Sequence, residues 1–295
     1  MTLTTTGNTD QKQESSLQEQ NSLQISVREG KAKLRAEDFK NPEYLSNLIH
    51  KIGHEIGNPL TSIISMATVL ESLHESKVPN VAGKEKQFRY INAIADEAWR
   101  ISRLNERLVM LFSSRAGSVS GCDIIRVSDK ALSKLKSRYK ESFKAVSVVF
   151  EVPEICPLVK IDEMQLLLVF TELFHNAKDA VDLKLQGEQL YRHKIEKQQV
   201  TIGVNINVGW DNDQSKEFAQ ISFSSNCMNP CPLELDTLFC PDVTGYPMYK
   251  RLGLGLPVCQ AIIERVGGDM KVIEEICDNE IVFSVKFSIP ITTDK

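Results

Sequence analysis

Residues 42–76 read PEYLSNLIHKIGHEIGNPLTSIISMATVLESLHES, and their apolar side chains recur at alternating spacings of four and three residues. This spacing keeps one helix face apolar along its whole length and is typical of a coiled-coil-like bundle. Pro59 takes the remaining position of the series. The stretch therefore predicts a long amphipathic helix. The apolar series is Leu45, Ile49, Ile52, Ile56, Ile63, Met66, Leu70 and Leu73.

A second helical pattern follows a polar break at residues 77–84 and runs from Phe88 to Leu111. Two long amphipathic helices joined by a short break form an antiparallel hairpin. One hairpin alone leaves an apolar stripe exposed to water. We therefore expect two copies of the chain to pair as a homodimer with a four-helix bundle.

Beyond Gly121 the pattern changes to helices that alternate with strands. Helices are expected at 129–143, 162–180 and 254–266, and strands at 146–152, 200–208, 218–224, 270–276 and 281–289. This order indicates an α/β sandwich of helices over a mixed sheet. The expected domains are the hairpin at 41–117 and the sandwich at 122–291. Residues 1–40 are polar and are expected to form a disordered leader.

Composition excludes several classes of protein. The net charge is −4, with 35 Lys+Arg against 39 Asp+Glu, which does not favour nucleic-acid binding. No stretch approaches the roughly 20 apolar residues of a membrane-spanning helix, and the first residues lack an export signal. The seven cysteines are scattered, which is typical of reduced thiols in a cytoplasmic protein.

His54 falls at the heptad position that points into solvent. Glu55 is its neighbour, and Asn58 lies one turn further along the same face. A phosphoryl acceptor needs an exposed imidazole and an acidic neighbour that can orient the ring and take its proton. The string from His54 to Leu60, HEIGNPL, resembles the H box of two-component sensor histidine kinases. The resemblance implies that His54 is autophosphorylated and passes its phosphoryl group to an aspartate of a response regulator, and that Glu55 and Asn58 support dephosphorylation of that regulator.

Two further strings point to a nucleotide. Glu172 and Asn176 are four residues apart on one helix face, where carboxylate and amide oxygens can hold Mg²⁺ against a triphosphate. Gly253 and Gly255 open a later helix, where backbone N–H groups favour phosphate. These strings resemble the N box and the second glycine box of the GHKL ATPase superfamily. The resemblance implies a Bergerat-type ATP-binding fold, with Mg²⁺ held by Asn176.

The sequence departs from that superfamily at its first glycine box. Aligning residues 221–223 with the family's strand places Ser225 at the adenine-binding aspartate, and Cys227 and Asn229 at two glycines. Loss of a charged hydrogen bond would weaken ATP binding about 10- to 150-fold. Ser225 retains an oxygen that can accept from adenine directly or through water. The cysteines of this region, Cys227, Cys231 and Cys240, form a candidate redox or metal site, although their spacing matches no common ligand pattern.

Three functions stay open at this point. The first is a histidine kinase core that uses Mg·ATP and receives its signal from a partner such as a membrane protein or sensor, from the leader or from the cysteines. The second is a degenerate kinase that acts as an ATP-independent histidine phosphotransferase or as a response-regulator phosphatase. The third is a scaffold that binds response regulators without chemistry.

Overall fold

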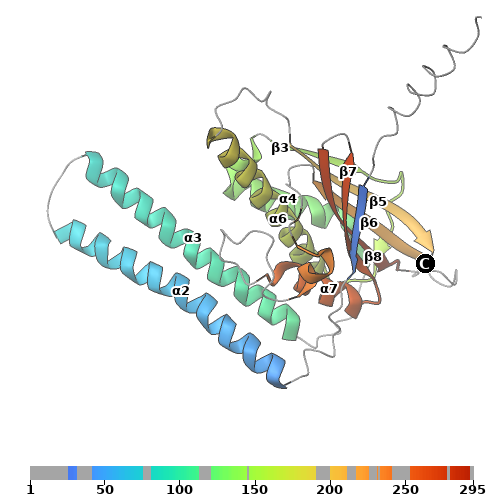
Figure 1. Cartoon of the computed structure of the whole chain (residues 1–295), viewed down its shortest axis with the longest axis horizontal. Helices are drawn as coiled ribbons and strands as arrows, with labels where there is room; N and C mark the ends of the chain where they lie inside the picture. The colour runs from blue at the N-terminus through green and yellow to red at the C-terminus, as the bar shows by residue number, and fades with distance from the viewer. Residues whose placement is uncertain are drawn as a thin grey trace, which may run out of the picture.

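The chain folds into a long helical hairpin with an α/β domain beside it, as Figure 1 shows for the computed structural model. The structure describes residues 26–31, 42–75, 81–112, 121–144, 146–190, 200–210, 217–225, 231, 233–240, 253–277 and 280–292. This arrangement confirms the predicted fold class of a helical hairpin followed by helices over a mixed sheet. Over the residues just given, no helix has the length and apolar character needed to cross a membrane.

The hairpin consists of α2 (Pro42–Glu75) and α3 (Val81–Phe112), which pack against each other. α3 begins at Val81 rather than at the predicted Phe88. The six residues between them, AGKEKQ, are mostly good helix formers, so the helix extends beyond its apolar stripe. Figure 1 shows α3 on the side of the hairpin that faces the α/β domain, where it contacts α7.

A six-stranded mixed sheet forms the outer layer of the α/β domain, with the order β1-β7-β8-β6-β5-β3. β3 and β5 are parallel, and the other neighbours are antiparallel. A separate two-stranded ladder joins β2 (Cys122–Asp123) to β4 (Leu158–Val159). The six strands are β1 (Ser26–Lys31), β3 (Val146–Glu151), β5 (Val200–Trp210), β6 (Glu217–Ser225), β7 (Met270–Cys277) and β8 (Glu280–Pro290).

Helices cover the face of the sheet that lies toward the hairpin (Figure 1). The core forms between the helices and the sheet, where Phe170 and Phe174 of α6 are fully buried. The ring centroid of Phe170 lies 6.1 Å from that of Phe287, and the ring centroid of Phe174 lies 5.0 Å from that of Phe223. α6 continues past its predicted end at residue 180, because most residues of 181–190 favour a helix. The helices are α4 (Ile124–Arg138), α5 (Lys140–Phe143), α6 (Glu163–Leu190) and α7 (Gly255–Arg265), with a short 3₁₀ helix, η3 (Leu235–Phe239).

The prediction of a disordered leader at residues 1–40 is wrong for Ser26–Lys31. These residues form β1, an edge strand that pairs antiparallel with β7. Val27 is exposed, so β1 is held by backbone hydrogen bonds and by Arg28, which donates to Glu274 at 2.8 Å. A strand held in this way shows no apolar alternation in its sequence. The rest of the predicted leader lies outside the described residues.

Candidate active site

His54 lies exposed on α2, as its heptad position predicts. Its Nε2 is 3.2 Å from Nε2 of His50, one turn earlier on the same helix. The two rings are nearly perpendicular, with centroids 4.7 Å apart. The imidazole is therefore open to an incoming reactant and has a second imidazole as its hydrogen-bonding partner.

Glu55 is half-buried and faces α3 rather than solvent. Its carboxylate accepts a hydrogen bond from Arg100 at 2.8 Å, and Arg100 also lies 3.8 Å from Glu97. The sequence predicts that Glu55 orients the ring of His54, whereas the structure pairs Glu55 with Arg100 and His54 with His50. Arg100 is thus a residue of the site that sequence reasoning missed.

Asn58 is exposed one turn beyond His54. Pro59 follows within α2 and has no N–H to donate to the preceding turn. Thr61 donates its hydroxyl to the Gly57 carbonyl at 2.8 Å, which supplies this part of the helix with a side-chain hydrogen bond. His54 and Asn58 therefore share an exposed stretch of α2.

Glu172 of α6 is completely buried, at 0% exposure, and is bound by two arginines of α3. Arg107 donates from Nε to Oε1 at 2.9 Å and from Nη2 to Oε2, while Arg103 donates to Oε2 at 3.1 Å. Both carboxylate oxygens therefore have guanidinium partners. Sequence reasoning missed these two residues, although Arg100, Arg103 and Arg107 recur along α3 at spacings of three and four, which places them on one face.

The charges of this cluster support each other. Burial by itself raises the pKa of Glu172, but attraction by Arg107 and Arg103 and the hydrogen bonding from Arg107 outweigh burial and hold that pKa well below its ordinary value. Burial lowers the pKa of Arg107, but Glu172 outweighs this effect and raises that pKa. Glu172 and the two arginines thus form a charged, largely buried ion cluster between the hairpin and the α/β domain.

Gly255 of the predicted phosphate site lies close to Glu172 and Asn176 of the predicted magnesium site. A Cβ added at Gly255, the first residue of α7, would lie 3.1 Å from Glu172 Oε2 and 3.9 Å from Asn176 Oδ1. Gly253 has φ 58°, a left-handed conformation that favours glycine. The structure thus brings Glu172, Asn176 and the start of α7 together, where the helix dipole favours negative charge.

Ser225 ends β6 and is buried, opposite Ile202 of β5 and Phe283 of β8. Cys227 and Asn229 lie outside the described residues. Cys231 and Cys240 are half-buried, and burial raises the pKa of the Cys231 thiol. Within the part of the chain that the structure describes, no three His, Cys, Asp or Glu side chains are grouped to hold a metal ion.

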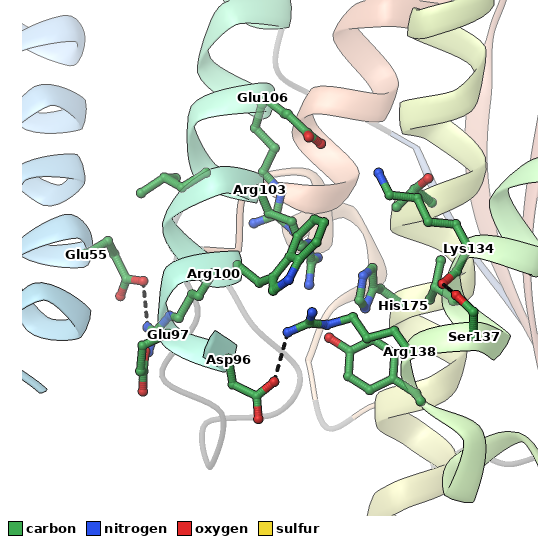
Figure 2. A pocket seen from close by; sticks show the side chains of 16 residues that line it. Glu55, Asp96, Glu97, Arg100, Arg103, Glu106, Lys134, Ser137, Arg138 and His175 are labelled. Atoms are coloured by element: carbon green, nitrogen blue, oxygen red, sulfur yellow. Dashed lines mark hydrogen bonds and ion pairs between the residues drawn. The ribbon is translucent and has the colours of Figure 1, made fainter. Parts of the chain in front are cut away.

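A cavity of about 450 Å³ lies where α3 meets α4 and α6. Figure 2 shows Glu55 on one side of it and His175 on the other, with Arg100 and Arg138 between them. Arg138 pairs with Asp96 at 2.8 Å and stacks over the ring of Trp99, 4.6 Å from its centroid. Polar and cation–π contacts therefore line the junction of the two domains.

The donor set of Glu172 and Asn176 suits a hard cation such as Mg²⁺, which prefers oxygen ligands. In the present conformation, however, the arginines of α3 already occupy Glu172. The residues thus fit the ion chemically, but the observed arrangement of α3 and α6 does not leave the carboxylate available to it.

Comparison with known proteins finds a family model that matches the hairpin. Residues 44–117 match the His Kinase A (phospho-acceptor) domain. The Sensor protein KdpD of Clostridium acetobutylicum is 23% identical over 246 residues, which are 83% of this chain but only 24% of that protein. The chain therefore spans a small part of the length of this curated relative.

Two solved structures share the fold. The histidine kinase AdeS of Acinetobacter baumannii is 16% identical with a TM-score of 0.51, over 81% of this chain and 98% of that chain. Full-length ShkA in complex with AMPPNP is also 16% identical with a TM-score of 0.51, over 86% of this chain and 47% of that chain. The chain thus carries a phosphoacceptor hairpin that matches the His Kinase A domain, and it shares its overall fold with these two histidine kinase structures.

Proposed function

We propose that the chain transfers the γ-phosphoryl group of ATP to His54 and then to an aspartate on the receiver domain of a response regulator. The observation that carries the proposal is the exposed His54 on a phosphoacceptor hairpin whose second helix contacts the Glu172–Asn176–Gly255 constellation. The structural relative ShkA was solved with AMPPNP, an ATP analogue, and we propose the same class of nucleotide for this chain.

In the proposed first step, an unprotonated ring nitrogen of His54 attacks the γ-phosphorus. The bond from phosphorus to the β–γ bridging oxygen breaks, and ADP leaves. If Nδ1 of His54 attacks, the proton on its Nε2 can pass to Nε2 of His50, 3.2 Å away. If Nε2 attacks, the proton on Nδ1 can pass to Glu55 once Arg100 releases that carboxylate. In the second step, the receiver carboxylate attacks the phosphohistidine and releases the imidazole.

The α/β domain would position the nucleotide. Backbone N–H groups at the start of α7 would face the phosphates, and the oxygens of Asn176 and Glu172 would hold Mg²⁺, which neutralises phosphate charge when bound. Ser225 would accept from the base in place of the family's aspartate. Because both ATP and response regulators are cytoplasmic reactants, the proposal implies a cytoplasmic location.

The hairpin is also the proposed dimer surface. Ile49, Ile64 and Phe88 are exposed by 64%, 64% and 65% in the single chain. Pairing with a second hairpin would remove such apolar surface from water, which is favourable by about 25 cal/mol per Å². Light scattering should give twice the chain mass.

The central test is labelling with γ-³²P-ATP and Mg²⁺. We expect wild type to gain an acid-labile, base-stable label that moves to a receiver domain, and His54→Gln to gain none. His74→Gln is the matched control, because His74 is another exposed histidine of α2. Absence of label, together with loss of phosphate from a phosphorylated receiver, would instead indicate a phosphatase or phosphotransferase. Neither activity would indicate a scaffold.

A further inference from the structure

Arg103 and Arg107 of α3 pair with Glu172 of α6 and so join the hairpin to the α/β domain. The proposed kinase reaction needs the same carboxylate to hold Mg²⁺. We infer that this arginine clamp (Arg103, Arg107 and Glu172) holds the α/β domain in a state that excludes Mg·ATP, so that nucleotide binding and docking of α3 compete for one carboxylate. The inference rests on the proposed function and concerns the regulation of its site.

Both carboxylate oxygens of Glu172 are already occupied. Oε1 of Glu172 accepts from Arg107, and Oε2 accepts from both Arg107 and Arg103, while the whole residue is shielded from water. A magnesium ion binds oxygen at about 2.0–2.1 Å and carries two positive charges. It cannot approach this carboxylate while two guanidinium groups lie against it. The ion and the clamp therefore exclude each other.

The clamp also reaches the proposed phosphate position. A Cβ at Gly255 would lie 3.8 Å from Nη2 of Arg107, so this guanidinium stands beside the first turn of α7. The N–H groups of that turn are the ones that would face a triphosphate. Arg107 thus fills space next to the phosphate position as well as neutralising Glu172.

The clamp is well placed to control docking of the hairpin on the α/β domain. The ion pair of Arg138 with Asp96 also joins the hairpin to the α/β domain, but Asp96 is 70% exposed, and exposed ion pairs contribute little. Breaking a buried pair is costly, because it leaves a charge without its partner. Release of Glu172 therefore requires that another cation replaces the arginines.

Arg100 links the clamp to the surroundings of His54. Arg100 lies one turn before Arg103 on α3 and binds Glu55, the neighbour of His54 on α2. One face of α3 thus contacts both α2, beside His54, and α6, at Glu172. A movement of α3 relative to α2 would change both contacts, which gives an input signal acting on the hairpin a direct route to the ATP site.

The inference is tested by titrating the full chain with mant-ATP in the presence of Mg²⁺ and following fluorescence anisotropy. The clamp variants are Arg103→Gln and Arg107→Gln. Arg89→Gln is the matched control, because Arg89 is an exposed arginine of the same helix. We expect both clamp variants to bind about 10-fold or more tightly than wild type, the equivalent of one charge-assisted hydrogen bond, and the control to match wild type.

The outcomes separate the inference from the proposed function. Equal binding by wild type and all variants would overturn the clamp and leave the kinase proposal standing. If no protein binds the nucleotide, the ATP-dependent function fails, and the clamp fails with it, because its release then opens no site. If the variants do not fold, hydrogen exchange of wild type decides. Adding Mg·mant-ATP should speed exchange of the 100–112 segment of α3, and unchanged exchange there would overturn the clamp.

Discussion

Replacing Arg28 with alanine should detach β1 from the sheet. Arg28 donates to Glu274 at 2.8 Å and to the carbonyls of Leu233 and Cys231 at 2.9 and 3.1 Å. Glu274 is 1% exposed, and its second oxygen accepts from the Cys231 N–H at 2.6 Å. The arginine therefore satisfies half of a buried carboxylate and two loop carbonyls at once.

The magnitude follows from burial. Breaking a fully buried ion pair costs about 3–5 kcal/mol. Arg28 is 37% exposed, so water screens part of this pair, and detachment of the strand lets water reach Glu274. We therefore expect a loss of about 2 kcal/mol for docking of β1. A difference of about 1.4 kcal/mol changes an equilibrium constant tenfold, so the population of molecules with β1 detached should rise about 30-fold.

Hydrogen exchange of the peptide that covers β7 (Met270–Cys277) measures this population directly. The amides of β7 that bond to β1 should exchange about 30-fold faster in Arg28→Ala. Gly30→Val should act in the same direction, because a Cβ there would lie 2.4 Å from the backbone carbon of Leu235. Glu29→Gln is the control, since the pair that Glu29 makes with Lys271 is exposed.

Unchanged exchange of β7 in both Arg28→Ala and Gly30→Val would refute the docked strand. So would rapid exchange of the same amides in wild type, because β1 would then not protect them.

Three further predictions concern stability and the domain junction. Gly268→Ala should lower the melting temperature strongly, because its Cβ would lie 1.9 Å from the Ser288 carbonyl oxygen. At Gly267 an added Cβ meets open space, so Gly267→Ala should cost only the roughly 1–2 kcal/mol of its left-handed φ of 84°. Phe174→Ala should lower the free energy of unfolding by about 3–5 kcal/mol in urea titrations, because the ring is fully buried. Acid should loosen α3 from α6, because the pKa of Glu172 is lower in the folded state than in the unfolded chain. The charged carboxylate stabilises the folded state fully above the ordinary pKa of a glutamate. This stabilisation is lost as pH falls through the folded-state pKa. Hydrogen exchange of α3 at decreasing pH, corrected for the intrinsic rate, should show this loss, and Glu172→Gln should abolish the pH dependence.

Much of the fold could be predicted from local patterns in the chain. The alternating apolar spacing of α2 predicts the hairpin and the exposure of His54, because heptad phase alone decides which side faces the partner helix. The strands β5, β6, β7 and β8 follow from apolar runs separated by polar turns. The approach of Glu172, Asn176 and Gly255 was implied by a family resemblance, and the structure places them together.

Tertiary structure alone decided the remaining features. β1 is a polar segment whose pairing with β7 depends on a neighbour more than 200 residues away in the chain, so no periodicity within it could reveal a strand. The partners of Glu55 and Glu172 were likewise hidden. A carboxylate in a sequence is equally compatible with solvent, a metal ion or an arginine, and only the packing of α3 between α2 and the α/β domain selects Arg100, Arg103 and Arg107. The physical reason is range: helix and strand periodicity reflects contacts within one element, whereas the charge partners of the site come from different elements brought together by folding.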